Sequence, residues 1–330
     1  MEVCISLWDR TPGMEDIMQI MLQLLLLAVG FIMLIKGADW FVDGASKMAD
    51  HFGIPQLVIG LTIVAMGTSA PEAAVSINSA IKQNAGITIG NVVGSNIMNV
   101  LVILGLTAVV RAIGVKKSTV CYEIPFTVLI TVILGLLGLT DNTVSRLDGV
   151  ILWGLMLLYL LYLLHMARKG QDVVEDTPGM TEKDTPLRLT LSIIIGGALI
   201  VWGADVTVDA ATELAHLFRM DDRLIGLTIV AFGTSLPELV TSVTAAIRGK
   251  ADIAVGNIVG SNIFNILFVV GTAALITPVD YRAGFWVDTV VAVLAMVFLL
   301  LCVLPKKKLG RLGGAAMLAG YAAYFFYLIQ

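Results

Sequence analysis

Two stretches of the chain, VAMGTSAPEAAVS (residues 64–76) and VAFGTSLPELVTS (residues 230–242), carry the same polar residues in the same order. Each places a glutamate, Glu72 or Glu238, directly after a proline inside an otherwise apolar segment. A proline removes a backbone hydrogen bond from a helix, and a carboxylate in an apolar segment is costly unless it is paired. Because the proline and the glutamate occur side by side in both copies, we expect them to serve one common role.

The composition indicates a membrane protein. The chain has 330 residues, of which 58% are hydrophobic and 14% charged, and its mean hydropathy is +0.91. A soluble domain has about 25% charged residues, so this chain is not built for water. Ten segments contain no Asp, Glu, Lys or Arg: residues 17–35, 52–71, 83–110, 124–140, 149–164, 189–204, 224–237, 253–279, 289–304 and 312–330.

These segments predict transmembrane helices. A helix needs roughly 20 apolar residues to span a bilayer, and most of the segments reach that length with their flanks. In hydrocarbon only helices and closed barrels satisfy the backbone, and long runs without alternation are typical of helices. We therefore expect an all-α integral membrane protein with about ten transmembrane helices in a lipid bilayer. The three cysteines lie far apart and form no CxxC motif, so they predict neither a disulfide nor a metal framework.

The chain repeats itself at an offset of 166 residues. Residues 60–110 and 226–276 share 27 identities over 51 positions without a gap. The same offset pairs GADWFVDGA (residues 37–45) with GADVTVDAA (residues 203–211). The sequence therefore predicts two copies of a unit of about five helices. The expected boundaries are an N-terminal leader at 1–16, a first repeat at 17–167, a cytoplasmic linker at 168–188 and a second repeat at 189–330.

An odd number of helices per repeat predicts that the two copies cross the membrane in opposite directions. With ten spans and the N-terminus outside, fourteen Lys and Arg residues fall on the inner side and six on the outer side, leaving out Lys36 within the first span. Because cytoplasmic loops collect positive charge, this favours both termini outside. Inverted repeats are typical of alternating-access transporters. The alternative is a simple gene duplication in a membrane scaffold.

The repeated motif has the pattern of a cation site. On a helix Ala65, Thr68 and Glu72 share one face with Ser69 beside them, and Pro71 kinks the helix and frees nearby carbonyl groups. Hydroxyl, carboxylate and carbonyl oxygens suit a hard cation such as calcium or sodium. The second copy supplies the same set: Ala231, Thr234, Ser235 and Glu238. The alternative is that both glutamates are protonated and only hold helices together.

A second shared segment follows each glutamate motif, GNVVGSNIMN at residues 90–99 and GNIVGSNIFN at residues 256–265. Each contains a GxxxG packing motif, which brings helices close together but says little about function. Ser95 and Asn99 lie one turn apart, as do Ser261 and Asn265, so these side chains can join the site. The related Asn91 and Asn257 fit interhelical hydrogen bonding at least as well as ion binding.

These motifs resemble the two α-repeats of the sodium/calcium exchanger branch of the calcium/cation antiporter superfamily. The resemblance rests on GTSAPE and GTSLPE followed by GNVVGSN and GNIVGSN, and it extends over essentially the whole chain. It implies a mid-membrane cation site between the second, third, seventh and eighth helices. The ligands it implies are Glu72, Glu238, Thr68, Ser69, Thr234, Ser235, the carbonyls of Ala65 and Ala231, Ser95, Asn99, Ser261 and Asn265.

One position departs from the family pattern. Where well-known members often carry an aspartate, this chain has Asn265, so the site holds two formal negative charges. Two charges balance one calcium or two sodium ions. We predict exchange of Ca²⁺ for Na⁺ by alternating access, with Ca²⁺/H⁺ exchange as the alternative because each glutamate can take a proton. A cation channel and an intramembrane enzyme are rival classes, but the chain shows no nucleophile or cofactor motif.

The remaining expectations concern surroundings and partners. We expect a multi-pass protein of the plasma (inner) membrane that is monomeric, uses no cofactor beyond the transported ions and binds no nucleic acid. Asp39, Asp43, Asp205 and Asp209 match across the repeats and are expected at solvated helix ends, with ion entry paths as the alternative. Glu123 and Asp288 are expected near helix starts without a function.

Overall fold

The computed structural model describes residues 14–82, 86–169, 185–218, 231–281 and 283–329. Nearly all of these residues are helical, as the composition predicts. The expected leader and linker lie mostly outside the described residues, and so does the segment 219–230 that precedes the second glutamate motif.

The first half of the chain contains helices that are interrupted by short π-helical turns, labelled η. Its elements are α1 (Met14–Phe52), α2 (Gln56–Ile59), η2 (Gly60–Val64), α3 (Ala65–Thr68), α4 (Ala70–Ile81), α5 (Gly86–Met98), η3 (Asn99–Leu104), α6 (Gly105–Val110), β1 (Ile113–Gly114), η4 (Thr119–Glu123), α7 (Ile124–Asp141), β2 (Thr143–Val144) and α8 (Arg146–Lys169).

The described part of the second half follows a similar order, without a counterpart of the π-turn η4. Its elements are α9 (Pro186–Leu217), α11 (Ala231–Thr234), α12 (Leu236–Ile247), α13 (Ala251–Phe264), η6 (Asn265–Val270), α14 (Gly271–Ile276), β3 (Val279–Asp280), α15 (Ala283–Val303), β4 (Lys308–Leu309) and α16 (Arg311–Ile329). Helices α4 and α12 begin and end at positions 166 residues apart, and so do the π-turns η3 and η6. The spacing of the sequence repeat therefore recurs in the local structure, including its irregular turns.

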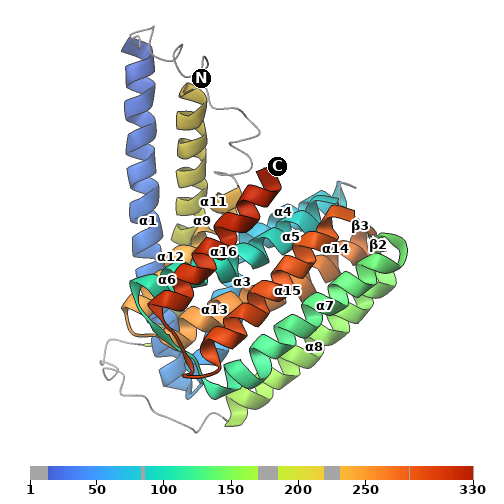
Figure 1. Cartoon of the computed structure of the whole chain (residues 1–330). Coiled ribbons are helices and arrows are strands. Elements are labelled where there is room, and N and C mark those ends of the chain that lie inside the picture. Colours follow the sequence, from blue (N-terminus) through green and yellow to red (C-terminus); the bar gives the residue numbers. More distant parts are fainter. Residues whose placement is uncertain (1–13, 83–85, 170–184, 219–230, 282, 330) are drawn as a thin grey trace.

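Seven helices of the described residues are long and apolar enough to cross a membrane, and an eighth span results if one bent helix pair is counted. Figure 1 shows α1 and α9 running side by side, with α7 and α8 forming a second pair on another side of the molecule. Within residues 251–276, which comprise α13, η6 and α14, 94% of the residues in the most apolar 18-residue stretch are buried. This segment is therefore the central element around which the others pack.

The buried residues form two clusters. The larger one gathers side chains from α5, α7, α8, α13 and α15, and the smaller one lies among α1, α9 and α12. Two short antiparallel ladders link the halves, since β1 pairs with β4 and β2 pairs with β3. These two-residue ladders are the only strands among the described residues, and they join loops at the ends of the helices.

The first glutamate motif bends its helix as the proline predicts. The segments Gln56–Thr68 and Ala70–Ile81 meet at an angle of 53°. The break falls at Ser69, whose ψ of 8° is not helical, and Pro71 occupies the first turn of the new helix α4. Because Pro71 has no N–H, it starts a helix at no cost in hydrogen bonds. In the second copy α11 ends at Thr234 and α12 begins after Ser235 in the same way.

The expectation that the four repeated aspartates lie at helix ends is wrong. Helix α1 continues thirteen residues past Asp39 to Phe52, and Asp205 lies twelve residues before the end of α9. Asp39 instead pairs with Arg248 at 2.7 Å. Asp43 pairs with Lys47 at 3.0 Å and approaches Arg248 at 3.7 Å. Ion pairing along the helix surface, rather than a helix terminus, therefore accommodates the charges of Asp39 and Asp43.

Candidate cation site

Each glutamate of the repeated motif stands in the first turn of a short helix. Glu72 lies in the first turn of α4 and Glu238 in the first turn of α12. The N-terminal end of a helix carries a partial positive charge, which favours a carboxylate there. Glu72 is 1% exposed and Glu238 is fully buried. The helix break after each Thr-Ser pair therefore places a carboxylate at a positive helix end deep inside the protein.

Hydrogen bonds between the two motifs cross from one half of the chain to the other. Ser69 Oγ donates to Glu238 Oε1 at 2.7 Å. Ser235 Oγ donates to Glu72 Oε1 at 3.4 Å. The serine at each helix break thus contacts the glutamate of the other repeat, and the two motifs form one cluster.

Two asparagines hold the glutamate helices to their neighbours. Asn257 Nδ2 donates to Ser242 Oγ at 2.9 Å and to the Glu238 carbonyl at 3.4 Å. Asn91 Nδ2 makes the equivalent bonds to Ser76 Oγ at 2.9 Å and to the Glu72 carbonyl at 3.3 Å. The interpretation of these residues as interhelical donors therefore holds in both halves.

Thr68 extends this network across the halves. Its hydroxyl lies 2.9 Å from Asn257 Oδ1, as a donor to that oxygen, and it also lies 3.1 Å from the Val64 carbonyl. Ser261 Oγ donates to the Ala65 carbonyl at 3.4 Å. Helix α13 therefore contacts both motifs. It bonds to α3, which precedes the first helix break, and to α12, which follows the second.

Glycines make this close approach possible. A methyl group on Gly260 would lie 2.8 Å from Leu61 Cα and from the Leu61 carbonyl oxygen. One on Gly256 would lie 3.0 Å from Gly60 Cα. Side chains larger than hydrogen would force the backbones apart, as at other GxxxG crossings. The second GxxxG motif thus brings α13 against η2 and α3, where the first glutamate motif begins.

Four asparagines form a second network at the contact of α5 with α13. Asn96 and Asn262 each donate to the backbone carbonyl of the other at 3.2 Å. Asn99 Nδ2 donates to Asn262 Oδ1 at 3.0 Å, and Asn265 Nδ2 donates to Asn96 Oδ1 at 3.2 Å. The sequence interpretation named Asn99 and Asn265 but missed Asn96 and Asn262. Their place in the repeated GSN triplet was the signal that could have found them.

Several buried oxygens of this region have no hydrogen-bond partner. They are Glu72 Oε2, Glu238 Oε2, Asn99 Oδ1, Asn265 Oδ1 and Thr241 Oγ1. A buried acceptor left without a partner costs about 1–3 kcal/mol, and more when it is charged. Five such oxygens of carboxylate, amide and hydroxyl type are the donor set that a hard cation prefers.

The other predicted residues are Ser95, Thr234 and Ala231. Ser95 is 6% exposed and makes no hydrogen bond to either glutamate motif among the described residues. Thr234 is half-buried, and Ala231 is the first residue of α11. The structure therefore joins Thr68, Ser69, Glu72, Ser235 and Glu238 through hydrogen bonds that cross between the two halves.

The acidic residues alone do not make a metal centre. Within the described ranges, no group of three or more His, Cys, Asp and Glu side chains could hold a metal ion. Binding a cation here requires the hydroxyl, amide and carbonyl oxygens as well as Glu72 and Glu238. A cluster of that kind inside a bundle of apolar helices defines the class of the protein: a multi-pass membrane protein with two buried carboxylates and other buried oxygens at the contact of its two halves.

Comparison with known proteins specifies this class. The family described as Sodium/calcium exchanger protein matches residues 22–165 and 188–330. The chain is 39% identical to "Putative antiporter CaxA" of Alkalimonas amylolytica over 92% of this chain and 97% of that protein. It is 30% identical to "Sodium/calcium exchanger MaX1" of Methanosarcina acetivorans, over 92% of this chain and 97% of the other.

A solved structure agrees with these relatives. The sodium-calcium exchanger NCX_Mj, soaked with zero Na⁺ and Ca²⁺, superposes with a TM-score of 0.81 and 33% sequence identity, covering 94% of this chain and 99% of that one. The chain belongs to the sodium/calcium exchanger family within the calcium/cation antiporter superfamily. This is a family of ion transporters, and membership supports a cation/calcium antiporter.

Proposed function

We propose that the protein exchanges Ca²⁺ for Na⁺ by alternating access at the cluster formed by the two glutamate motifs. The observation that carries this proposal is the reciprocal pair of bonds from Ser69 to Glu238 and from Ser235 to Glu72, beside unpartnered oxygens of both carboxylates. A single cation at this point neutralises charges from both halves of the chain. Ca²⁺ and Na⁺ compete for the same oxygens.

The ion ligands in this proposal are the residues expected from the sequence. Glu72 and Glu238 supply the negative charge. Hydroxyl oxygens come from Thr68, Ser69, Thr234 and Ser235. The carbonyls of Ala65 and Ala231 add two backbone oxygens. Ser261 supports the site through its 3.4 Å bond to the Ala65 carbonyl. Ser95, Asn99 and Asn265 contribute from α5, η3 and η6, and Asn99 Oδ1 and Asn265 Oδ1 lack hydrogen-bond partners.

Exchange without leak follows from the cost of moving charge. An empty site carries two carboxylates in a buried position, and ionised groups inside a membrane are expensive. Binding one Ca²⁺ or two Na⁺ removes that charge. Only a neutralised site then crosses between the two access states, so one ion must be replaced by the other before the protein returns.

Alternation further requires the inverted architecture. We infer ten transmembrane helices in two inverted five-helix repeats, with the second repeat following a cytoplasmic linker at 168–188 and both termini outside the inner membrane. The recurrence of α4 as α12 and of η3 as η6 at one spacing supports the duplication. The helix Leu236–Ile247 and the C-terminal α16 then complete spans beyond the eight identified by length and hydropathy.

Ca²⁺/H⁺ exchange is the second candidate function. Asn265 lies in the site where a third carboxylate would add charge, and its Oδ1 is buried without a partner. With two carboxylates, two protons neutralise the site as fully as one Ca²⁺. A third Na⁺ would be left uncompensated, so the counter-ion depends on this position.

Uptake of radiolabelled calcium into proteoliposomes tests the proposal. We expect uptake when Na⁺ is loaded inside and absent outside, and no uptake when only a proton gradient of equal size is imposed. Uptake with the proton gradient alone would replace Na⁺ by H⁺ as the counter-ion. Absence of uptake under both gradients would contradict calcium antiport, provided that a cooperative thermal unfolding transition shows the protein to be folded.

A further inference from the structure

A further buried carboxylate, that of Glu123, lies outside the cation cluster, where η4 meets α7 and faces α8. Glu123 is 1% exposed, and its Oε1 accepts a hydrogen bond from the Tyr162 hydroxyl. Its Oε2 is buried without a partner. None of the ion pairs among the described residues includes Glu123. The expectation that Glu123 merely marks a helix start therefore leaves a buried carboxylate oxygen unexplained.

The local backbone accounts for the position of this carboxylate. Glu123 ends the π-helical turn η4, and the next helix α7 has Pro125 in its first turn. Pro125 has no N–H to donate to the carbonyl four residues earlier, and π-turns form where the regular helix ladder is interrupted. The wider turn rotates Glu123 toward α8 instead of along the face of α7.

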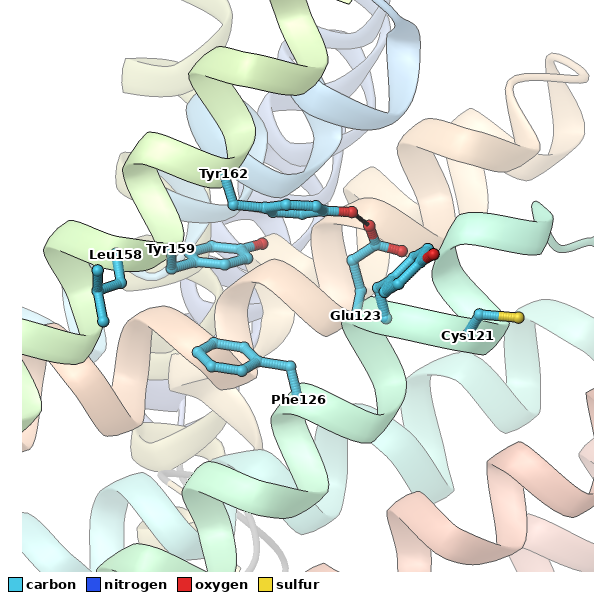
Figure 2. A pocket seen from close by; sticks show the side chains of 7 residues that line it. Cys121, Glu123, Phe126, Leu158, Tyr159 and Tyr162 are labelled. Carbon is cyan, nitrogen blue, oxygen red and sulfur yellow. Dashed lines mark hydrogen bonds between the residues drawn. The ribbon is translucent and has the colours of Figure 1, made fainter.

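A cavity of about 330 Å³ lies against this carboxylate, lined by Cys121, Tyr122, Glu123, Phe126, Leu158, Tyr159 and Tyr162. Figure 2 shows the hydroxyls of Tyr159 and Tyr162 pointing toward the side on which Glu123 lies. The volume is at the lower end of the range of about 300–1,000 Å³ for small-molecule sites. Cys121 and Leu158 are exposed at its rim, so the cavity opens on the outer surface of the helix pair.

The walls of the cavity are aromatic. Phe126 and Tyr159 stack with ring centroids 5.5 Å apart, and Tyr159 stacks on Tyr162 at 6.3 Å. Tyr122 approaches Tyr162 at 6.5 Å. Faces of aromatic rings attract cations, and aromatic walls are a recurrent means of binding organic ammonium groups.

Two polar atoms beside these aromatic rings have no hydrogen-bond partner, and one ligand could satisfy both. Glu123 Oε2 and the Tyr159 hydroxyl are both buried without hydrogen bonds. A group with several N–H donors and a positive charge satisfies both oxygens and neutralises the carboxylate.

We propose that this cavity binds an alkylammonium group, with its cationic head between Glu123 and Tyr159 and its apolar body along Phe126 and Leu158. The ligand chemistry is a primary ammonium on an apolar chain. A free amine and the ammonium headgroup of a lipid both offer it. The proposal is independent of calcium exchange, because none of these residues belongs to the cation cluster.

Hexylamine is the probe, and Cys121 supplies the readout because it is exposed at the rim. The rate at which iodoacetamide alkylates Cys121, followed by mass spectrometry of the purified full chain, should fall as hexylamine is added. The uncharged analogue hexanol should leave the rate unchanged. Protection by hexanol equal to that by hexylamine would overturn the proposal, because it would show an apolar cavity without a charge requirement.

Glu123→Gln keeps the shape of the side chain and removes its charge. We expect it to weaken protection by hexylamine about 10- to 100-fold, as the loss of a charge-assisted hydrogen bond does. Asp141→Asn, at an exposed carboxylate at the other end of α7, is the matched control and should bind as the unaltered protein does. Equal protection in Glu123→Gln and the unaltered protein would overturn the proposal.

A second variant covers the case in which Glu123→Gln fails to fold. Tyr159→Phe removes only the unpartnered hydroxyl and keeps the ring, and we expect it to weaken protection by about 3- to 10-fold. Unchanged protection in Tyr159→Phe, together with loss of the folded state in Glu123→Gln, would contradict the placement of the ammonium between these residues.

Vesicles separate the two sources of the ligand. The protein is placed in phosphatidylglycerol vesicles with or without phosphatidylethanolamine, and Cys121 alkylation is measured in each. Slower alkylation with phosphatidylethanolamine, lost in Glu123→Gln, would identify a lipid headgroup as the occupant. Protection by hexylamine alone would identify a free amine. Protection by neither would overturn the proposal.

Discussion

The two glutamate motifs have nearly the same sequence but unequal surroundings. Glu238 accepts its bond from Ser69 at 2.7 Å, whereas Glu72 accepts from Ser235 at 3.4 Å. Asn257, beside Glu238, is fully buried, while Asn91, beside Glu72, is half-buried. Under the proposed alternating access, exchanging these two environments would convert one access state into the other. In this structure Glu238 has the shorter hydrogen bond and the more buried asparagine neighbour.

The largest expected effect comes from removing both carboxylates. The double variant Glu72→Ala, Glu238→Ala should lose calcium uptake by more than about 100-fold, since a desolvated divalent cation depends on both charges and each 1.4 kcal/mol is a factor of ten. The measurement is uptake into proteoliposomes. The matched control is Asp141→Ala, Glu213→Ala, which removes two exposed carboxylates and should transport normally. Measurable calcium uptake by the first double variant would count heavily against the site.

The next largest effect is expected from alanine substitutions in the two GxxxG motifs, which should differ in how much they destabilise the protein. Gly260→Ala places a methyl group 2.8 Å from the Leu61 backbone and should destabilise the protein by about 1–3 kcal/mol. Gly94→Ala, at the matching position of the first copy, has open space beside it and should cost less than about 1 kcal/mol. Thermal unfolding in detergent compares them. Equal destabilisation would show that the close crossing is not specific to α13.

The two serines sharpen the comparison of the glutamates. Ser69→Ala removes the shorter bond and should weaken calcium binding about tenfold, whereas Ser235→Ala should weaken it about threefold, since a hydrogen bond to a charged group contributes more when it is short. Equilibrium calcium binding measures both. The reverse order would indicate that the Glu72 side holds the ion more closely.

The smallest effect is expected at the ion pairs of α1. Arg248 pairs with Asp39 and Asp43 through side chains that are about a third exposed or more. Arg248→Ala should therefore change stability by only about 0–1 kcal/mol, and less at high salt. Thermal unfolding at low and high salt tests this, with Lys306→Ala, on an exposed turn, as control. A large loss that persists at high salt would assign Arg248 a larger role.

The sequence predicted the parts of this structure that depend on local rules. Pro71 and Pro237 predicted helix breaks beside Glu72 and Glu238, because a missing N–H acts within one turn. The identity of the partner across a break could not be predicted, since it depends on which helices meet. The bonds from Ser69 to Glu238 and from Asn96 to Asn262 join residues about 170 positions apart.

The error at the aspartates has the same origin. Asp39 and Asp43 were expected at a solvated helix end, yet α1 continues to Phe52, and Arg248, which directly follows α12, pairs with both aspartates. Glu123 does lie directly before the start of α7, as expected, but its burial and its bond from Tyr162 of α8 could not be predicted from its own segment. In both cases a charged residue was assigned from its own segment, whereas a distant segment determines its environment.

Calcium bound per chain at equilibrium is the measurement that tests the shared site most directly. It is made on the purified protein and on the single variants Glu72→Gln and Glu238→Gln. If one ion lies between the two motifs, the unaltered protein binds one Ca²⁺ and each single variant loses that ion almost completely. Retention of full-affinity calcium binding by either variant would contradict a site shared by the two halves.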